Sequence, residues 1–188
     1  MVAHSLRSRL KVDATIEQGR ELTSARFWSK SPPEARLMPQ IETRQFGILT
    51  YAPEQIIHFA AGLPGFEECH DFLLHQEEAM GVFVFLQSLT DANLSFVTLP
   101  AEQLEENYEL TLSRDDLAQL EMSALPSPGQ VTCLAILQLN PGGATANLAA
   151  PLVISSATRR GTQAIRQDRR YSASQPVRWP ASSDEGGH

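Results

Sequence analysis

The stretch VTCLAILQL, residues 131–139, decides the fold class of this chain. In an extended strand its odd-numbered residues (Val, Cys, Ala, Leu and Leu) share one face, while Leu134 and Ile136 lie on the other. Because both faces are apolar, the pattern indicates a strand that is covered on both sides. The stretch therefore predicts a central strand of a β-rich domain.

Short apolar runs with the same strand-like character recur on both sides of this stretch, and turn signals separate them. These runs are RQFGILTY, QIIHFA, DFLLH, GVFVFLQS, LSFVTLP, YELTL, APLVISS and TQAIR. SRDDLAQLEM instead predicts a helix, because Ser113 is a good N-cap and the two following acids, Asp115 and Asp116, suit a first helical turn. PAEQLEENY predicts a further helical turn. The fold class expected is mainly β, an antiparallel barrel-like or sandwich domain with one or two short helices.

The expected domain organisation is a single body, residues 38–177, between two tails. Residues 1–37 lack a sustained apolar period and contain the breaker SPPE, so they predict a flexible N-terminal extension. Residues 178–188 predict a disordered tail. The N-terminus has no apolar run long enough for a signal peptide or a membrane span, and only two cysteines occur. A cytoplasmic protein with free thiols is expected.

Charge is distributed very unevenly along the chain. Residues 41–157 hold two basic side chains against fifteen acidic ones, whereas the residues before and after this range each carry a net charge of +3. An acidic body repels the phosphates of nucleic acids, and it steers basic proteins toward itself. Solubility alone is the simpler interpretation of such a surface.

The stretch GLPGFEECHDF, residues 62–72, is the densest group of turn and polar residues. It is not a phosphate-binding loop, because Phe66 and Glu67 stand where that loop requires Lys and Ser or Thr. Pro64 and Gly65 suit the central positions of a type II turn. Gly62, Pro64 and Gly65 are therefore predicted to form a structural corner.

Two polar features leave other functions open. Cys69, His70 and His75 suggest a metal-dependent hydrolase, but they lack the spacing of a known zinc motif, and surface histidines are favoured. No nucleophile motif such as GxSxG occurs, so an enzyme is a weak hypothesis and no cofactor is expected. The arginine-rich segment 158–178 suggests an RNA-binding module around Tyr171, or equally a basic segment folded onto the acidic body.

The stretch PGGATANLAAPLVIS, residues 141–155, combines a turn with a run of small residues. Pro151 suits the first position of a strand, where its missing N–H is tolerated. The small residues around Asn147 permit close backbone approach, which indicates either a tight strand crossing or a smooth protein-docking surface.

Several of these motifs together resemble, in the same order, the FliW family of bacterial flagellar assembly factors. The resemblance runs from about residue 40 to about residue 171 and rests on IIHFAAGLPGFEE, FLQSLTDANLSFVTL, YELTLSRDDLAQL, CLAILQL, ATANLAAPLVIS and TRRGTQAI. Family members usually begin just before the FG strand, so residues 1–37 are an addition, and Met38 is an alternative initiator.

The resemblance implies a cytoplasmic, mainly β, barrel-like domain without enzymatic activity. It implies two protein partners: flagellin, which is protected before export, and CsrA, a small basic RNA-binding dimer that represses translation. When flagellin leaves the cell, the freed factor would capture CsrA, and flagellin synthesis would resume. No membrane and no direct nucleic-acid partner is expected. The residues expected to bind a partner are Glu67, Glu68, Asp71, Asp91, Asn147 and Leu148.

Overall fold

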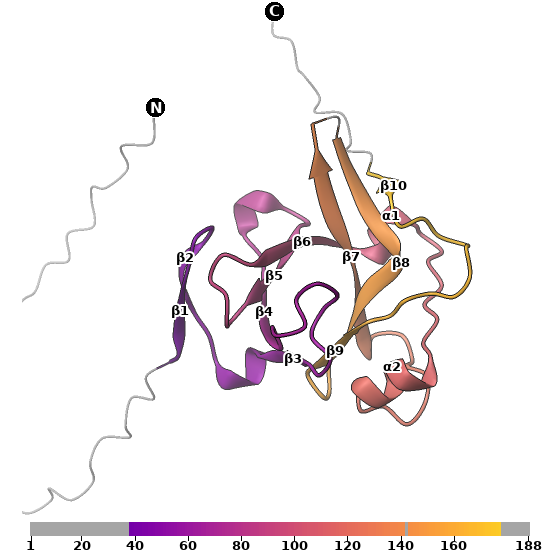
Figure 1. Ribbon diagram of the computed structural model, residues 1–188, viewed down its shortest axis with the longest axis horizontal. Coiled ribbons are helices and arrows are strands. Elements are labelled where there is room, and N and C mark those ends of the chain that lie inside the picture. Colours follow the sequence, from indigo (N-terminus) through magenta and orange to yellow (C-terminus); the bar gives the residue numbers. More distant parts are fainter. Residues whose placement is uncertain (1–37, 142, 178–188) are drawn as a thin grey trace, which may run out of the picture. The chain divides into compact units, whose positions relative to one another are not determined.

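The computed structural model describes residues 38–141 and 143–177 (Figure 1). The predictions of a flexible segment at 1–37 and a disordered tail at 178–188 lie outside the described residues. The elements are β1 (Gln40–Thr43), β2 (Gly47–Thr50), η1 (Pro53–Gln55), β3 (Ile57–Phe59), β4 (Asp71–His75), η2 (Glu78–Met80), β5 (Val84–Ser88), β6 (Ser95–Pro100), α1 (Ala101–Leu104), α2 (Arg114–Gln119), β7 (Val131–Asn140), β8 (Gly143–Ser155), β9 (Arg160–Gln163) and β10 (Gln175–Pro176). Within these residues, no helix is both long and apolar enough to cross a membrane.

Among the described residues, seven strands close into a barrel in the order β8-β7-β6-β5-β4-β3-β9, and the pairing of β8 with β9 completes the ring. Neighbouring strands are antiparallel except β3 and β9, which run parallel through the pair His58 and Arg160. Strand β10 pairs with β8 outside the ring. The predicted mainly β, barrel-like architecture with short helices is confirmed.

Strand β7 has apolar residues on both faces, as its sequence predicts. Leu134 and Ile136 belong to the cluster that fills the barrel interior, whereas Ala135 and Leu137 belong to a second cluster on the outer surface. The interior cluster also contains Ile57, Phe59, Leu63, Phe72, Leu86, Leu152 and Ile154. Both ends of the strand depart from the pattern, since Thr132 is exposed and Leu139 is exposed on the β7–β8 hairpin that extends past the barrel in Figure 1.

Strand β8 carries a bulge where it passes from the hairpin into the barrel. Leu134 of β7 pairs with Leu152, but Ile136 pairs with Asn147, so residues 148–151 of β8 lie opposite a single residue of β7. The prediction that a strand starts at Pro151 was wrong, because β8 runs through it. The Pro151 carbonyl accepts from the Ala164 amide just beyond the last β8–β9 pair, so its missing N–H falls at the end of that ladder, where a proline is tolerated.

Helix α2 packs on the outer surface of β8 and β9. Its start agrees with the sequence: Ser113 Oγ accepts a hydrogen bond from the Asp116 amide at 3.1 Å, and an Asp116 carboxylate oxygen accepts one from the Ser113 amide at 2.7 Å. These reciprocal bonds form a capping box. Leu120, at the C-cap, is fully buried against Val153 and Ala164.

The segment YELTL, residues 108–112, was predicted as a strand but forms none in the structure. Leu110 and Leu112 pack against the cluster beneath α2, and Tyr108 packs against the neighbouring outer cluster. The alternation of apolar residues therefore reflects side chains packed on the barrel surface rather than backbone pairing. The strand prediction was wrong for that reason.

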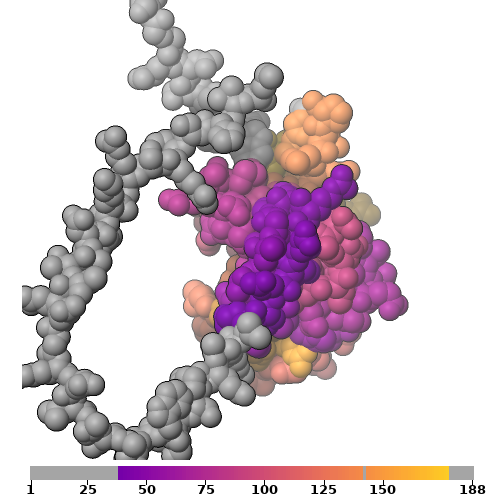
Figure 2. All heavy atoms as spheres, turned by 90° about the vertical axis from the view of Figure 1, so that its left-hand side faces the viewer, coloured from indigo at the N-terminus to yellow at the C-terminus, as the bar shows by residue number. Residues whose placement is uncertain are grey.

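The hairpin of β1 and β2 covers a different part of the barrel wall. The run RQFGILTY, predicted as one strand, divides into a turn and β2, and Phe46 in the turn packs edge-on against Phe85 of β5 at 4.8 Å between ring centroids. The same ring lies 4.7 Å from His75 of β4. In Figure 2 the hairpin stands as an indigo ridge across this face of the molecule.

Candidate functional site

The loop between β3 and β4 lies in front of the barrel interior in Figure 1 and inserts Leu63 into the interior cluster. The Phe66 amide donates to the Leu63 carbonyl at 2.7 Å, and Gly65 has a φ of +84°. A type II turn requires this hydrogen bond and a positive φ at this position. Gly62 also has a positive φ of +66°. The corner thus holds Leu63 in the mouth of the barrel.

Four of the residues expected to bind a partner lie at this end of the barrel and are here called the acidic rim: Glu67, Glu68, Asp71 and Asp91. The loop at 60–70 joins β3 to β4 and the turn at 89–94 joins β5 to β6. Because β3 to β6 are antiparallel neighbours, both connections lie at the same end.

Hydrogen bonds orient the carboxylates of the acidic rim. Glu67 accepts from the Gly65 amide at 2.8 Å, and this bond lowers the pKa of the Glu67 carboxyl. Asp71 lies 2.7 Å from the His58 ring nitrogen, and Asp91 accepts from the Asn93 amide at 2.9 Å. The rim presents these negative groups mainly to solvent, where a basic partner would meet them.

The histidines considered for a metal site are held by separate partners. His70 contacts the Phe59 carbonyl at 3.0 Å, whereas His75 contacts the Glu77 carboxylate at 2.7 Å and the Phe46 ring. Among residues 38–141 and 143–177, no three His, Cys, Asp or Glu side chains gather closely enough to hold a metal ion. The geometry of this part of the chain does not support the hydrolase hypothesis.

The basic segment lies on the acidic body rather than projecting from it. Arg160 forms an ion pair with Glu121 at 2.9 Å, and Arg170 forms one with Glu109. Arg159 donates to the Gln55 carbonyl at 2.7 Å. These contacts favour the second of the two interpretations of this segment, internal neutralisation, over a free RNA-binding arm.

Arg166 is the most enclosed of these arginines, with a side chain only 2% exposed. Its guanidinium lies 4.8 Å from the Tyr171 ring centroid and 5.9 Å from that of Tyr108, while the two rings lie 4.5 Å apart. It donates to Asp168 at 2.7 Å and to the Glu109 carbonyl. The hydrogen bond with Asp168 raises the pKa of Arg166 and lowers that of the carboxyl. These contacts of Arg166 with Tyr108, Tyr171, Asp168 and Glu109 are here called the clasp. The clasp fixes the segment 164–177 to the barrel surface.

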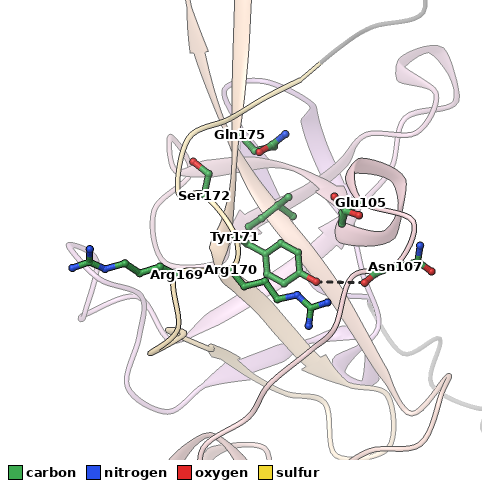
Figure 3. Close-up of a pocket in the computed structure, with 8 residues that line it drawn as sticks. Glu105, Asn107, Arg169, Arg170, Tyr171, Ser172 and Gln175 are labelled. Carbon is green, nitrogen blue, oxygen red and sulfur yellow. Dashed lines mark hydrogen bonds between the residues drawn. The ribbon is translucent and has the colours of Figure 1, made fainter.

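A polar hollow of about 490 Å³ lies beside the clasp (Figure 3). Tyr171 spans it, donating to the Asn107 carbonyl at 3.4 Å, and Arg169 is directed away from the Tyr171 ring. Leu148 lies in its wall but is only 1% exposed. Asn147 accepts from the Ala150 amide at 3.0 Å and thereby supports the bulge of β8.

These positions separate the residues expected to bind a partner into two groups. The acidic rim brings four of them to one end of the barrel, whereas Asn147 and Leu148 lie at the bulge of β8 and are engaged in the fold. A partner at the bulge would meet their backbone and the small residues around them rather than the Leu148 side chain.

A second, apolar cleft of about 620 Å³ opens on the outer surface where β7 begins. Leu110, Leu112, Leu125 and Val131 contribute to its lining, and Cys133 also lines it. Burial raises the pKa of the Cys133 thiol to about 12 and that of the nearby Tyr108 hydroxyl to about 12. Such a thiol stays protonated near neutral pH and is a poor nucleophile.

The sequence offers no local signal for the clasp and a weak one for the apolar cleft. Arg166 and Tyr108 are 58 positions apart, and no local pattern joins them. The exposed Leu125 among prolines and serines was the one visible sign of the cleft, because a leucine in a turn-rich segment has no local packing partner.

Comparisons with known proteins agree with the fold. The family model described as FliW protein matches residues 40–177. A flagellar assembly factor FliW from Azoarcus sp. (strain BH72) is 39% identical to this chain, and the alignment covers 67% of this chain and 90% of that protein. One from Desulfitobacterium hafniense (strain Y51) is 38% identical, and the alignment covers 71% of this chain and 87% of that protein. A crystal structure of the flagellar assembly factor FliW matches with a TM-score of 0.66 and 31% identity, covering 73% of this chain and 96% of that one.

Proposed function

This chain belongs to the FliW family of flagellar assembly factors, and we propose that it acts in the cytoplasm by binding two proteins, a CsrA-type RNA-binding regulator and flagellin. It acts by binding and not by catalysis. Captured regulator no longer represses its messages, and bound flagellin is protected before export.

The observation that carries the proposal is the charge of the body. Residues 41–157 hold fifteen acidic side chains against two arginines, and the acidic rim presents several of these acids at one end of the barrel. Arg160 and Arg170 are paired with acids of the body itself, so the basic segment offsets part of this charge locally. A surface of one sign raises the rate at which a partner of the opposite sign arrives.

Exchange between the two partners follows from mass action. Each partner stabilises the state to which it binds. The free concentration of flagellin therefore determines how much of this protein is left unoccupied and able to bind the regulator. If the two partners bind in competition or with negative coupling, the effect is reciprocal, because coupling free energy is shared between sites.

Calorimetric titration tests the proposal. The full chain is titrated separately with the CsrA-type regulator and with flagellin encoded by the same genome. We expect each to bind with a defined stoichiometry, and we expect regulator affinity to weaken as salt rises. Absence of heat and of complex on gel filtration with both partners would contradict the proposed function.

A further inference from the structure

The first residues of β7 form an incomplete part of the barrel wall. Strand β6 pairs only with Leu134–Ile136 of β7, through Thr98–Pro100, after which the chain turns into α1. Val131–Cys133 therefore pair with β8 on one side, and within the described residues no strand lies on the other. Natural proteins usually cover such an edge, because its peptide groups are ready to pair with another chain.

The direction of the peptide groups along this edge follows from strand alternation. The Ser156 amide donates to the Gln130 carbonyl at 3.0 Å, so the carbonyl of residue 130 faces β8, while its amide donates to the Ser127 carbonyl in the preceding turn. Successive residues of an antiparallel strand direct their N–H and C=O to opposite sides. The N–H and C=O groups of Val131 and Cys133 therefore face the open edge.

The apolar cleft lies beside this edge. Val131 and Cys133 line it together with Leu110, Leu112 and Leu125, and Leu125 is 69% exposed. Glu102 also lines the cleft, and its charge adds to burial in raising the Cys133 pKa, whereas the positive charge of Arg166, which is not among the lining residues, lowers it. No lysine or arginine is among the lining residues. An occupant thus meets unpaired peptide groups, an apolar wall and negative charge.

We propose that an extended segment of a basic partner adds to β7 at Val131–Cys133, placing apolar side chains in the cleft and lysine or arginine side chains toward Glu102. Strand addition supplies backbone hydrogen bonds, and the cleft selects the side chains that alternate along the segment. The inference rests on the proposed function, under which the basic partner is the CsrA-type regulator.

Two variants and one control test the proposal by titration of the full chain with the regulator. Val131→Pro removes the N–H that faces the open edge at the first residue of a strand, where proline is tolerated, and we expect roughly three- to tenfold weaker binding. Leu125→Ser removes an exposed apolar side chain from the cleft, with an expected loss of about tenfold or more. Leu139→Ser, a 68% exposed leucine on the β7–β8 hairpin, is the matched control and should bind as the wild type does.

Amide hydrogen exchange gives a second readout, since the amides of Val131 and Cys133 should exchange more slowly in the complex. If Val131→Pro fails to fold, Leu125→Ser decides the result, because its exposed side chain contributes little to stability. Wild-type affinity in both cleft variants, with unchanged exchange at residues 131 and 133, would overturn this inference and leave the proposed function intact. Absence of regulator binding by the wild type would overturn the proposed function, and the inference with it.

Discussion

Replacement of Gly62 by alanine tests how the corner closes the barrel. The φ of +66° costs an alanine about 1–2 kcal/mol, because its Cβ approaches the carbonyl oxygen. That Cβ would also lie 2.6–2.8 Å from the carbonyl oxygen, Cα and carbonyl carbon of Glu67. Because these are backbone atoms, the contact is relieved only by moving the loop, which adds about 1–3 kcal/mol. The expected loss of unfolding free energy for Gly62→Ala is therefore about 2–5 kcal/mol.

Gly65→Ala is the matched control for this change. Gly65 has a comparable positive φ of +84°, but a Cβ there has no heavy atom within 4 Å, so only the conformational cost of about 1–2 kcal/mol applies. Urea denaturation followed by circular dichroism measures both variants, and midpoints are compared at equal slopes. Losses that agree within about 0.5 kcal/mol would refute the claim that contact with Glu67, rather than backbone conformation alone, fixes Gly62.

Four further changes have defined outcomes. Arg166→Met should lower the unfolding free energy by about 1.5–3 kcal/mol, because it removes charge-assisted hydrogen bonds. Replacement of the exposed Arg169 by methionine is the control and should change the unfolding free energy by less than about 0.5 kcal/mol. Equal effects of the two changes in urea denaturation would contradict the claim that the clasp stabilises the fold. Burial raises the Cys133 pKa from 9.0 to about 12, so the folded state keeps its proton to higher pH than the unfolded chain does. Stability should therefore fall as pH rises from about 9 to about 12 and fall less in Cys133→Ala, measured by urea midpoints. Gly161→Ala should lower the unfolding free energy by about 1–3 kcal/mol, because the added Cβ would lie 2.4–2.7 Å from atoms of the Phe59 ring. In a double-mutant cycle, Phe59→Leu should recover part of that loss. The association rate with the regulator should fall as salt rises, and a rate constant that salt leaves unchanged in stopped-flow mixing would count against electrostatic steering.

The sequence predicts the parts of this fold in which one local pattern has one structural solution. The apolar residues at both odd and even positions of 131–137 predict a strand covered on both faces. The N-cap Ser113 and the acidic Asp116 predict where α2 begins. The segment 108–112 also has apolar residues at alternate positions, yet its leucines pack on the barrel surface without a partner strand. A single sequence does not distinguish these cases, because both bury every second side chain.

The candidate site depends on contacts between distant parts of the chain, which explains why less of it was predicted. The acidic rim was visible because its carboxylates lie near turn residues in sequence. The packing of Arg166 against Tyr171 and Tyr108 was not visible, since arginines in a polar segment are ordinarily solvated. Leu148 was expected at a docking surface, but its side chain is buried in the outer cluster with Leu99 and Ala135.

The central claim, that this protein relieves repression by capturing a basic regulator and that flagellin reverses the capture, is tested most directly with a labelled RNA target. Fluorescence anisotropy of the RNA bound to the CsrA-type regulator should fall when the full chain is added, and it should rise again when flagellin follows. The full chain alone should leave the anisotropy of free RNA unchanged. The account would be contradicted if an excess of the protein did not lower the anisotropy of the regulator–RNA complex. It would also be contradicted if the protein alone raised the anisotropy of free RNA.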